Sequence, residues 1–274
     1  MAELIGEGIT AGYGDRTVIR RLSLAVAAGK ILSIIGPNGS GKSTLLKTLA
    51  RNIQPLEGAV LLDGEDIRHL AGKQLARRLA MLHQTATAPS DLTVRDLVEY
   101  GRFPFRNWWR GATAADGAIA AWALNQTGLT SLAARPVSTL SGGERQRAWI
   151  ALALTQQPEV LLLDEPTTHL DISHQLEILD LIAKLNQEQR ITILMVLHDI
   201  NYASFYSDTV AVLTQGKLFA AGPPHEVVTS SMLREVFQVE ADVWQNANGR
   251  PVSMARRLAA VPPGSWRTTE NIPQ

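Results

Sequence analysis

The apolar positions of this chain form short runs that alternate with helical patterns over much of its length. Val160–Leu163 and Ile191–Leu197 are continuous apolar runs, which are typical of central strands buried on both faces of a parallel sheet. Lys30–Ile35 is a third β-rich run, and Gln175–Gln187 has the spacing of an amphipathic helix. The pattern therefore predicts an α/β fold.

Two other parts of the chain depart from this alternation. Leu4–Gly12 and Leu22–Val26 are predicted strands of an antiparallel N-terminal subdomain, with a turn at Gly14-Asp15. Residues from about 86 to 155 lose the strand pattern, which predicts an inserted α-helical subdomain.

The C-terminal part returns to strands and short helices. Thr209–Phe219 is predicted to be a hairpin that turns at Gln215-Gly216. Two short helices are expected after Gly222, ending near Phe237. We expect a single domain over residues 1–258 and a polar tail over residues 259–274.

Composition narrows the classes of function. The 274 residues are 45% hydrophobic, which allows a substantial core, and 26 Lys plus Arg balance 26 Asp plus Glu. A zero formal charge gives no global basic field for nucleic acid. The chain has no cysteine, no signal-peptide pattern and no apolar run near 18 residues, so a role at a membrane would need a partner.

One glycine-rich stretch between a predicted strand and a predicted helix matches G-x-x-x-x-G-K-[ST]. Backbone N–H groups at such a turn form a cradle for a polyphosphate, Lys42 can reach the β- and γ-phosphates, and the Ser43 hydroxyl can ligate Mg²⁺. An ordinary glycine-rich turn is the alternative, but the pattern arises by chance in roughly one chain in a hundred of this length. The predicted nucleotide-binding residues are Gly36, Pro37, Asn38, Gly39, Ser40, Gly41, Lys42, Ser43 and Thr44.

Two carboxylates follow the buried run at Val160–Leu163. Since parallel strands end at the sheet edge where the phosphate loop also lies, Asp164 is a candidate Mg²⁺ ligand. Glu165 is the candidate base that orients and deprotonates a water aimed at the γ-phosphate. A solvated strand end is the alternative interpretation of both residues.

A second candidate anion site lies at Ser141, Gly142 and Gly143, where a serine cap and two glycines begin a predicted helix. The alternative is a plain helix start. Two such sites and one acidic strand end indicate that two chains share each nucleotide.

Taken together, these motifs resemble the ATPase subunit of an ABC transporter over almost the whole chain. The resemblance implies a P-loop NTPase core, with Gln84 as the Q-loop glutamine, Asp171 as the D-loop aspartate and His198 as the switch histidine. It also implies that Tyr13 stacks on adenine. Glu144 stands where the family signature commonly has glutamine, and its role is open.

The roles implied by the resemblance form three sets. The catalytic residues are Glu165, His198, Lys42 and Gln84. Tyr13, Asp171 and the signature residues Ser141, Gly142 and Gly143 join the phosphate loop in binding ATP. The Mg²⁺ ligands are Ser43, Gln84 and Asp164.

Gly101-Arg-Phe-Pro, Leu197-His-Asp-Ile-Asn201 and the residues around Ser141 and Asp164 are similar to importer ATPases for ferric siderophores. That group is close to the ATPases for haem and cobalamin, which remain alternatives. The resemblance implies a head-to-tail dimer with a second copy, an integral-membrane permease above it and an extracytoplasmic substrate-binding protein. It places the chain peripherally on the cytoplasmic face of the inner membrane, with no nucleic acid partner.

The predicted loop Gly101–Gly111 interleaves aromatic residues with arginines, and Phe103–Arg110 within it is either a permease contact or a plain exposed loop. A soluble ABC ATPase that acts as a regulator or on nucleic acid is an alternative of another class. A non-catalytic nucleotide-binding scaffold is a third.

Overall fold

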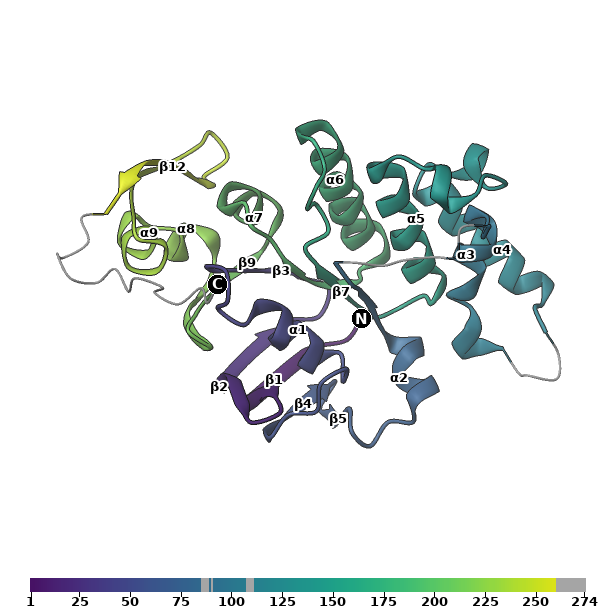
Figure 1. Ribbon diagram of the computed structural model, residues 1–274, viewed down its shortest axis with the longest axis horizontal. Helices are drawn as coiled ribbons and strands as arrows, with labels where there is room; N and C mark the ends of the chain where they lie inside the picture. Colours follow the sequence, from purple (N-terminus) through teal and green to yellow (C-terminus); the bar gives the residue numbers. More distant parts are fainter. Residues whose placement is uncertain (85–88, 90, 107–110, 260–274) are drawn as a thin grey trace, which may run out of the picture.

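The computed structural model describes residues 1–84, 89, 91–106 and 111–259. Its N-terminal part is an antiparallel sheet in the order β2-β1-β4-β5. The strands are β1 (Leu4–Tyr13), β2 (Arg16–Val26), β4 (Glu57–Leu62) and β5 (Glu65–Asp66). The predicted antiparallel subdomain and its turn after Tyr13 are therefore present, as Figure 1 shows below the centre of the molecule.

The central sheet has the order β10-β9-β3-β8-β7-β6. Its strands are β3 (Ile31–Ile35), β6 (Leu79–Leu82), β7 (Val160–Asp164), β8 (Thr192–Val196), β9 (Thr209–Thr214) and β10 (Lys217–Gly222). The pairs from β6 to β9 are parallel, whereas β10 closes the edge antiparallel to β9. The C-terminal ends of β3, β7 and β8 thus meet at one edge of the sheet.

The continuously apolar strands of the central sheet contribute side chains to a hydrophobic core on each face of the sheet. Leu162 and Leu194 face a core shared with the antiparallel sheet and α1 (Lys42–Leu49), which lies between the two sheets in Figure 1. Leu163 and Met195 face the opposite core, beneath the helices. Because side chains alternate along a strand, a run without polar positions is what this two-sided burial requires.

Helices cover the second face of the central sheet. They include α5 (Gly142–Thr155), α6 (Ile172–Gln189) and α7 (Ile200–Tyr206), while α2 (Gly72–Arg78) precedes β6. The insertion consists of α3 (Val94–Tyr100), α4 (Ala114–Gln126) and α5, with short 3₁₀ turns at Phe103–Phe105, Thr130–Leu132 and Val137–Thr139. The C-terminal part contains α8 (Pro224–Val227), α9 (Ser230–Phe237), β11 (Val239–Gln245) and β12 (Pro251–Leu258).

Some predicted elements differ from the structure. The second strand begins at Arg16 rather than Leu22, because the hairpin turn is immediately followed by pairing with β1. The segment Gly101–Gly111 is not a simple loop, since Gly101 caps α3 and Phe103–Phe105 forms a 3₁₀ turn. The helix α7 and the β11–β12 hairpin were not predicted. The start of the insertion near 86 and the tail from 260 lie outside the described residues.

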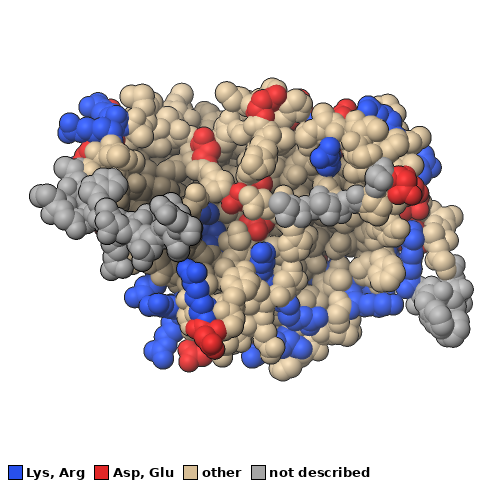
Figure 2. All heavy atoms as spheres, in the orientation of Figure 1, with Lys and Arg blue, Asp and Glu red and all other residues tan. Residues whose placement is uncertain are grey.

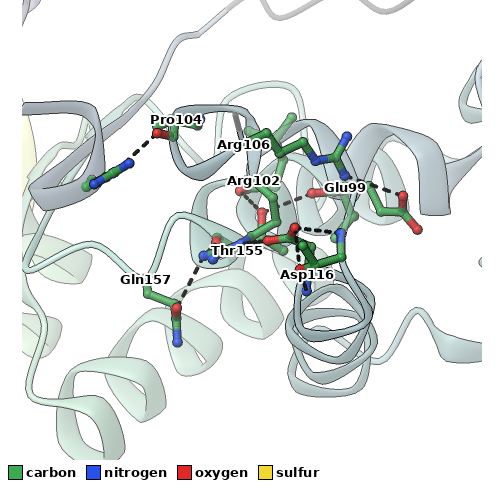
Figure 3. A network of polar contacts seen from close by, with 11 residues as sticks. Glu99, Arg102, Pro104, Arg106, Asp116, Thr155 and Gln157 are labelled. Atoms are coloured by element: carbon green, nitrogen blue, oxygen red, sulfur yellow. Dashed lines mark hydrogen bonds and ion pairs between the residues drawn. The ribbon is translucent and has the colours of Figure 1, made fainter. Parts of the chain in front are cut away.

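Arg102, which precedes the predicted contact Phe103–Arg110, is a buried connection within the insertion. Its Nε lies 2.9 Å from the Asp116 Oδ1 on α4, and its Nη1 donates to the Thr155 carbonyl at the end of α5 over 2.8 Å (Figure 3). The Phe105 ring covers the guanidinium, whose carbon lies 3.8 Å from the ring centroid. Trp108, Trp109 and Arg110 of the predicted contact lie outside the described residues.

The surface carries both signs of charge. Figure 2 shows carboxylates near the middle of one face, with Lys and Arg gathered over its lower half, where Figure 1 places α1, α2 and the antiparallel sheet. Within the described residues, each helix is too short or too polar to cross a bilayer.

Candidate nucleotide and hydrolysis site

The predicted phosphate loop connects β3 to α1 at the C-terminal edge of the central sheet. At Gly36, with φ 152°, an added Cβ would lie 2.1 Å from the Leu213 carbonyl oxygen. At Gly41, with φ 103°, it would lie 2.6 Å from Cδ1 of Ile19. The loop therefore needs glycine at both positions, and it presents the N-terminus of α1, whose first N–H groups have no partner within the helix.

Lys42 folds back over this loop, and its Nζ donates to the carbonyls of Gly36 at 2.8 Å and Pro37 at 3.1 Å. Burial lowers the pKa of Lys42, against the opposing effect of Glu165 and Asp164. The buried Oγ of Ser40 has no hydrogen-bond partner. A buried cation and an unpaired hydroxyl beside free helix N–H groups fit a polyphosphate.

Ser43 and Asp164 come together as predicted, with Ser43 Oγ donating to Asp164 Oδ1 at 2.9 Å. Burial raises the pKa of Asp164, against the opposing effects of the Ser43 hydrogen bond and the charge of Lys47. A hydroxyl and a carboxylate suit Mg²⁺, which takes its remaining ligands from phosphate and water. The described part of the chain holds no group of three or more acidic, histidine or cysteine side chains that could bind a metal.

Glu165 is held by three side chains at the C-terminal end of β7. Its Oε2 accepts from Gln84 Nε2 at 2.6 Å and from Thr168 Oγ1 at 3.1 Å, while its Oε1 lies 2.8 Å from His198 Nε2. Its backbone has φ 54°, in the left-handed region. Gln84, Glu165 and His198 are thus brought together, and their catalytic roles stay predictions.

The signature residues begin α5, and Ser141 caps this helix. The Ser141 Oγ accepts from the Glu144 N–H at 3.3 Å, and a Glu144 carboxylate oxygen accepts from the Ser141 N–H at 2.8 Å. This reciprocal capping box accepts Glu or Gln, which accounts for Glu144 in the signature. The hydrogen bond from the Ser141 backbone lowers the pKa of Glu144.

Asp171 caps α6 and orients His174, since its Oδ1 lies 2.7 Å from His174 Nδ1 and accepts the His174 N–H at 3.0 Å. The His174 ring packs against the signature, because a Cβ on Gly143 would lie 2.4 Å from His174 Cδ2. The predicted nucleotide contact of Asp171 stays a prediction. What the structure adds is a link from the D-loop to the signature of the same chain.

Other predicted residues lie apart from this cluster. Tyr13 is exposed at the end of β1 and free to stack on a ligand. Among the described residues, no hydrogen bond or ion pair joins Ser141, Gly142 or Gly143 to the phosphate loop. Thr168 was not predicted, although its position three residues after Glu165 suits a turn hydrogen bond.

Comparison with known proteins gives a family match, a similar curated protein and two similar solved structures. The model of the family described as "ABC transporter" matches residues 19–168. The chain is 48% identical over 243 residues, covering 89% of it and 90% of the relative, to the iron(3+)-hydroxamate import ATP-binding protein FhuC of Bacillus subtilis strain 168.

Two solved structures share the fold. An inward-facing conformation of a putative metal-chelate type ABC transporter aligns with a TM-score of 0.81 and 27% identity, over 93% of this chain and 97% of the other. A dimeric post-hydrolysis state of the ATP-binding cassette MJ0796 bound to ADP and Pi aligns with a TM-score of 0.69 and 29% identity, over 80% of this chain and 98% of the other.

Proposed function

This chain belongs to the ABC transporter family, and from that premise we propose that it is the ATPase subunit that powers import of a ferric siderophore. The relative named for iron(3+)-hydroxamate import matches at 48% identity over nine-tenths of both chains. The single observation that carries the catalytic part of the proposal is the environment of Glu165. Its carboxylate is contacted by Gln84, Thr168 and His198, and it directly follows Asp164 in the sequence.

In the proposed reaction, Glu165 orients a water and takes its proton as the water attacks the γ-phosphate of ATP. The bond between the γ-phosphorus and the bridging oxygen breaks, and that oxygen leaves on ADP while inorganic phosphate forms. Lys42 and the N-terminus of α1 hold the phosphate oxygens, and His198 keeps the carboxylate of Glu165 in position. Ser43, Gln84 and Asp164 would hold Mg²⁺, which supplies positive charge at the phosphates. Tyr13 stacks on the adenine.

Gln84 would have two successive partners. It donates to Glu165 through Nε2 in the structure, and its side-chain oxygen would face the cation when nucleotide is bound. Since Gln84 leads into the helical insertion, we infer that this exchange carries the state of the nucleotide to the permease.

A second copy completes each nucleotide site. Ser141, Gly142 and Gly143 present a capped helix N-terminus that contacts no phosphate loop within the described chain, so in a head-to-tail dimer they would close the partner's site. Asp171 would lie beside that junction. A membrane permease would bind the dimer on the cytoplasmic face of the membrane, and an extracytoplasmic binding protein would deliver the chelate.

The Glu165→Gln variant tests the catalytic assignment. We expect ATP binding to persist and steady-state turnover to fall by about two to four orders of magnitude, because the amide cannot accept the proton. The variant should also accumulate as a dimer in ATP, visible by size-exclusion chromatography. Normal turnover would remove Glu165 as the base.

Transport in vesicles with the co-purified permease tests the physiological assignment. We expect uptake of a ferric hydroxamate to require the wild-type chain, with ATP supplied on the side of the membrane where the ATPase is bound. Uptake of haem or cobalamin without uptake of ferric chelates would show that the proposed substrate is wrong and would assign one of these alternatives. Absence of any membrane partner on co-purification would contradict the transport role.

A further inference from the structure

The C-terminal hairpin β11–β12 lies outside residues 19–168, which the family model matches, and no role was predicted for it. One of its faces packs against the main core, through the partly buried Val239, Ala241 and Val243. The hairpin lies against α7, as Figure 1 shows at the upper left, and α7 begins two residues after His198.

Asn201, the second residue of α7, is paired with a single residue of β12. Its Nδ2 donates to the Ser253 carbonyl at 3.1 Å, and its Oδ1 accepts from the Ser253 N–H at 2.8 Å. The Ser253 hydroxyl adds a third contact to the same Oδ1 at 3.1 Å. The amide therefore pairs with both backbone groups of Ser253, as a neighbouring strand would.

The same hairpin also holds the other end of α7. Arg250 Nη1 donates to the carbonyl of Ser204 at 3.2 Å and to that of Ser207 at 2.6 Å. These contacts satisfy carbonyls that have no partner within the helix, and they place a cation at its negative end. The helix is thus fixed to the hairpin at both termini.

The residues on both sides of His198 are held by hydrogen bonds. On one side, Leu197 follows β8, and its N–H donates to the Ile34 carbonyl at 3.1 Å. On the other side, Asp199 caps α7 by accepting the Tyr202 N–H at 2.9 Å. Because His198 is one residue from each, a shift of the start of α7 moves the imidazole relative to Glu165, from which it is 2.8 Å away.

We propose that Asn201 is a positioning residue for ATP hydrolysis, which through Ser253 and α7 holds His198 against Glu165. This inference rests on the proposed roles of Glu165 and His198. It gives the C-terminal hairpin a function in the reaction, as the outer support of the switch histidine. It also distinguishes the two ends of α7, since Asn201 is in the first turn, three residues after His198, and Arg250 contacts the far end.

Steady-state ATPase measurements on the full chain, at concentrations where it is dimeric, test the proposal. We expect Asn201→Ala to lower kcat by roughly ten- to a hundredfold with an unchanged KM for ATP, because a displacement of about 1 Å misaligns the site without altering nucleotide binding. Asn201→Asp keeps both acceptor contacts and the shape of the side chain, so it should fold and show an intermediate loss.

Two controls separate positioning from general stability. Ser253→Ala leaves both backbone partners of Asn201 in place, and we expect near-normal kcat. Arg250→Ala weakens the same helix–hairpin contact at the end remote from His198, so it should lower the melting temperature with little change in kcat below it. Equal kcat losses in Arg250→Ala and Asn201→Ala would overturn the proposal.

A double-mutant cycle with His198→Ala gives the decisive readout. If Asn201 acts through His198, adding Asn201→Ala to His198→Ala causes no further loss of kcat. Additive losses, or normal turnover in His198→Ala, would overturn the inference. Glu165→Gln, measured alongside, distinguishes failure of the proposed function from failure of this inference. Normal turnover in Glu165→Gln would contradict the proposed function. Loss of turnover in Glu165→Gln together with normal turnover in Asn201→Ala would contradict this inference alone.

Discussion

Replacing the buried carboxylate Asp116 by asparagine should destabilise the helical insertion. The Asp116 side chain is 8% exposed and that of Arg102 7%. The pKa of Asp116 is about 2 instead of 3.8, first because Arg102 hydrogen-bonds the carboxylate and second because the Thr113 N–H does. By linkage, this difference corresponds to about 2 kcal/mol of folding free energy at neutral pH.

Asp116→Asn also leaves the Arg102 guanidinium buried beside Phe105 without its counter-charge. Breaking a buried pair in this way costs about 3–5 kcal/mol. We therefore expect the free energy of unfolding to fall by between about 2 and 5 kcal/mol at pH 7, measured by urea unfolding with circular dichroism. Faster amide hydrogen exchange should be concentrated in α3, α4 and the end of α5.

The pH dependence follows from the sign of the shift. A folded-state pKa below the unfolded value means that the contribution of Asp116 is complete above about 4 and is lost as pH falls through about 2. The linkage part of the stability difference between wild type and Asp116→Asn should thus shrink to about half at pH 3.

The exposed pair Arg234–Glu240 is the matched control, with hydrogen bonds of 2.9 and 2.7 Å. Because water competes for exposed charges, Glu240→Gln should have a far smaller effect than Asp116→Asn. Equal losses in the two variants, or a pH-independent difference for Asp116→Asn, would refute the reasoning that burial sets the magnitude.

Variants at three further positions test the nucleotide site. Ser43→Ala should raise the Mg²⁺ concentration needed for half-maximal ATPase activity by at least about tenfold, because loss of a residue that merely hydrogen-bonds a metal ligand already weakens metal binding by that factor. An unchanged Mg²⁺ requirement would contradict the assignment of Ser43 as a ligand. Gly143→Ala should abolish turnover but not ATP binding, because its Cβ would lie 2.4 Å from His174. Wild-type turnover in this variant would show that His174 can move aside without loss of activity. Glu144→Ala should cost about 1 kcal/mol in thermal unfolding by breaking the cap on Ser141, whereas Glu144→Gln should cost little; equal losses would exclude the capping box.

The strand-end motifs could be predicted from sequence because they depend on local patterns. A continuous apolar run such as Val160–Leu163 predicts burial on both faces, and its end then places Asp164 and Glu165 at the edge shared with the phosphate loop. The capping role of Glu144 could also have been predicted from its spacing to Ser141.

Other features depend on long-range packing that leaves a weak local pattern. The first half of β2 is rich in exposed arginine, so its pairing with β1 was not evident. The helix α7 has only seven residues, and β11–β12 is half-buried with charged positions, which obscures the alternation. The buried position of Arg102 could not be predicted, because nothing near it in sequence indicates Asp116 fourteen residues later.

The left-handed backbone of Glu165 has a consequence for engineering this chain. At φ 54° a non-glycine residue carries about 1 kcal/mol or more of conformational strain, which Gly would relieve and Asn would tolerate. A screen that selects only for heat resistance should therefore favour replacement of the residue proposed as the catalytic base. Directed stabilisation of such an ATPase should keep position 165 unchanged, or couple each round of selection to turnover.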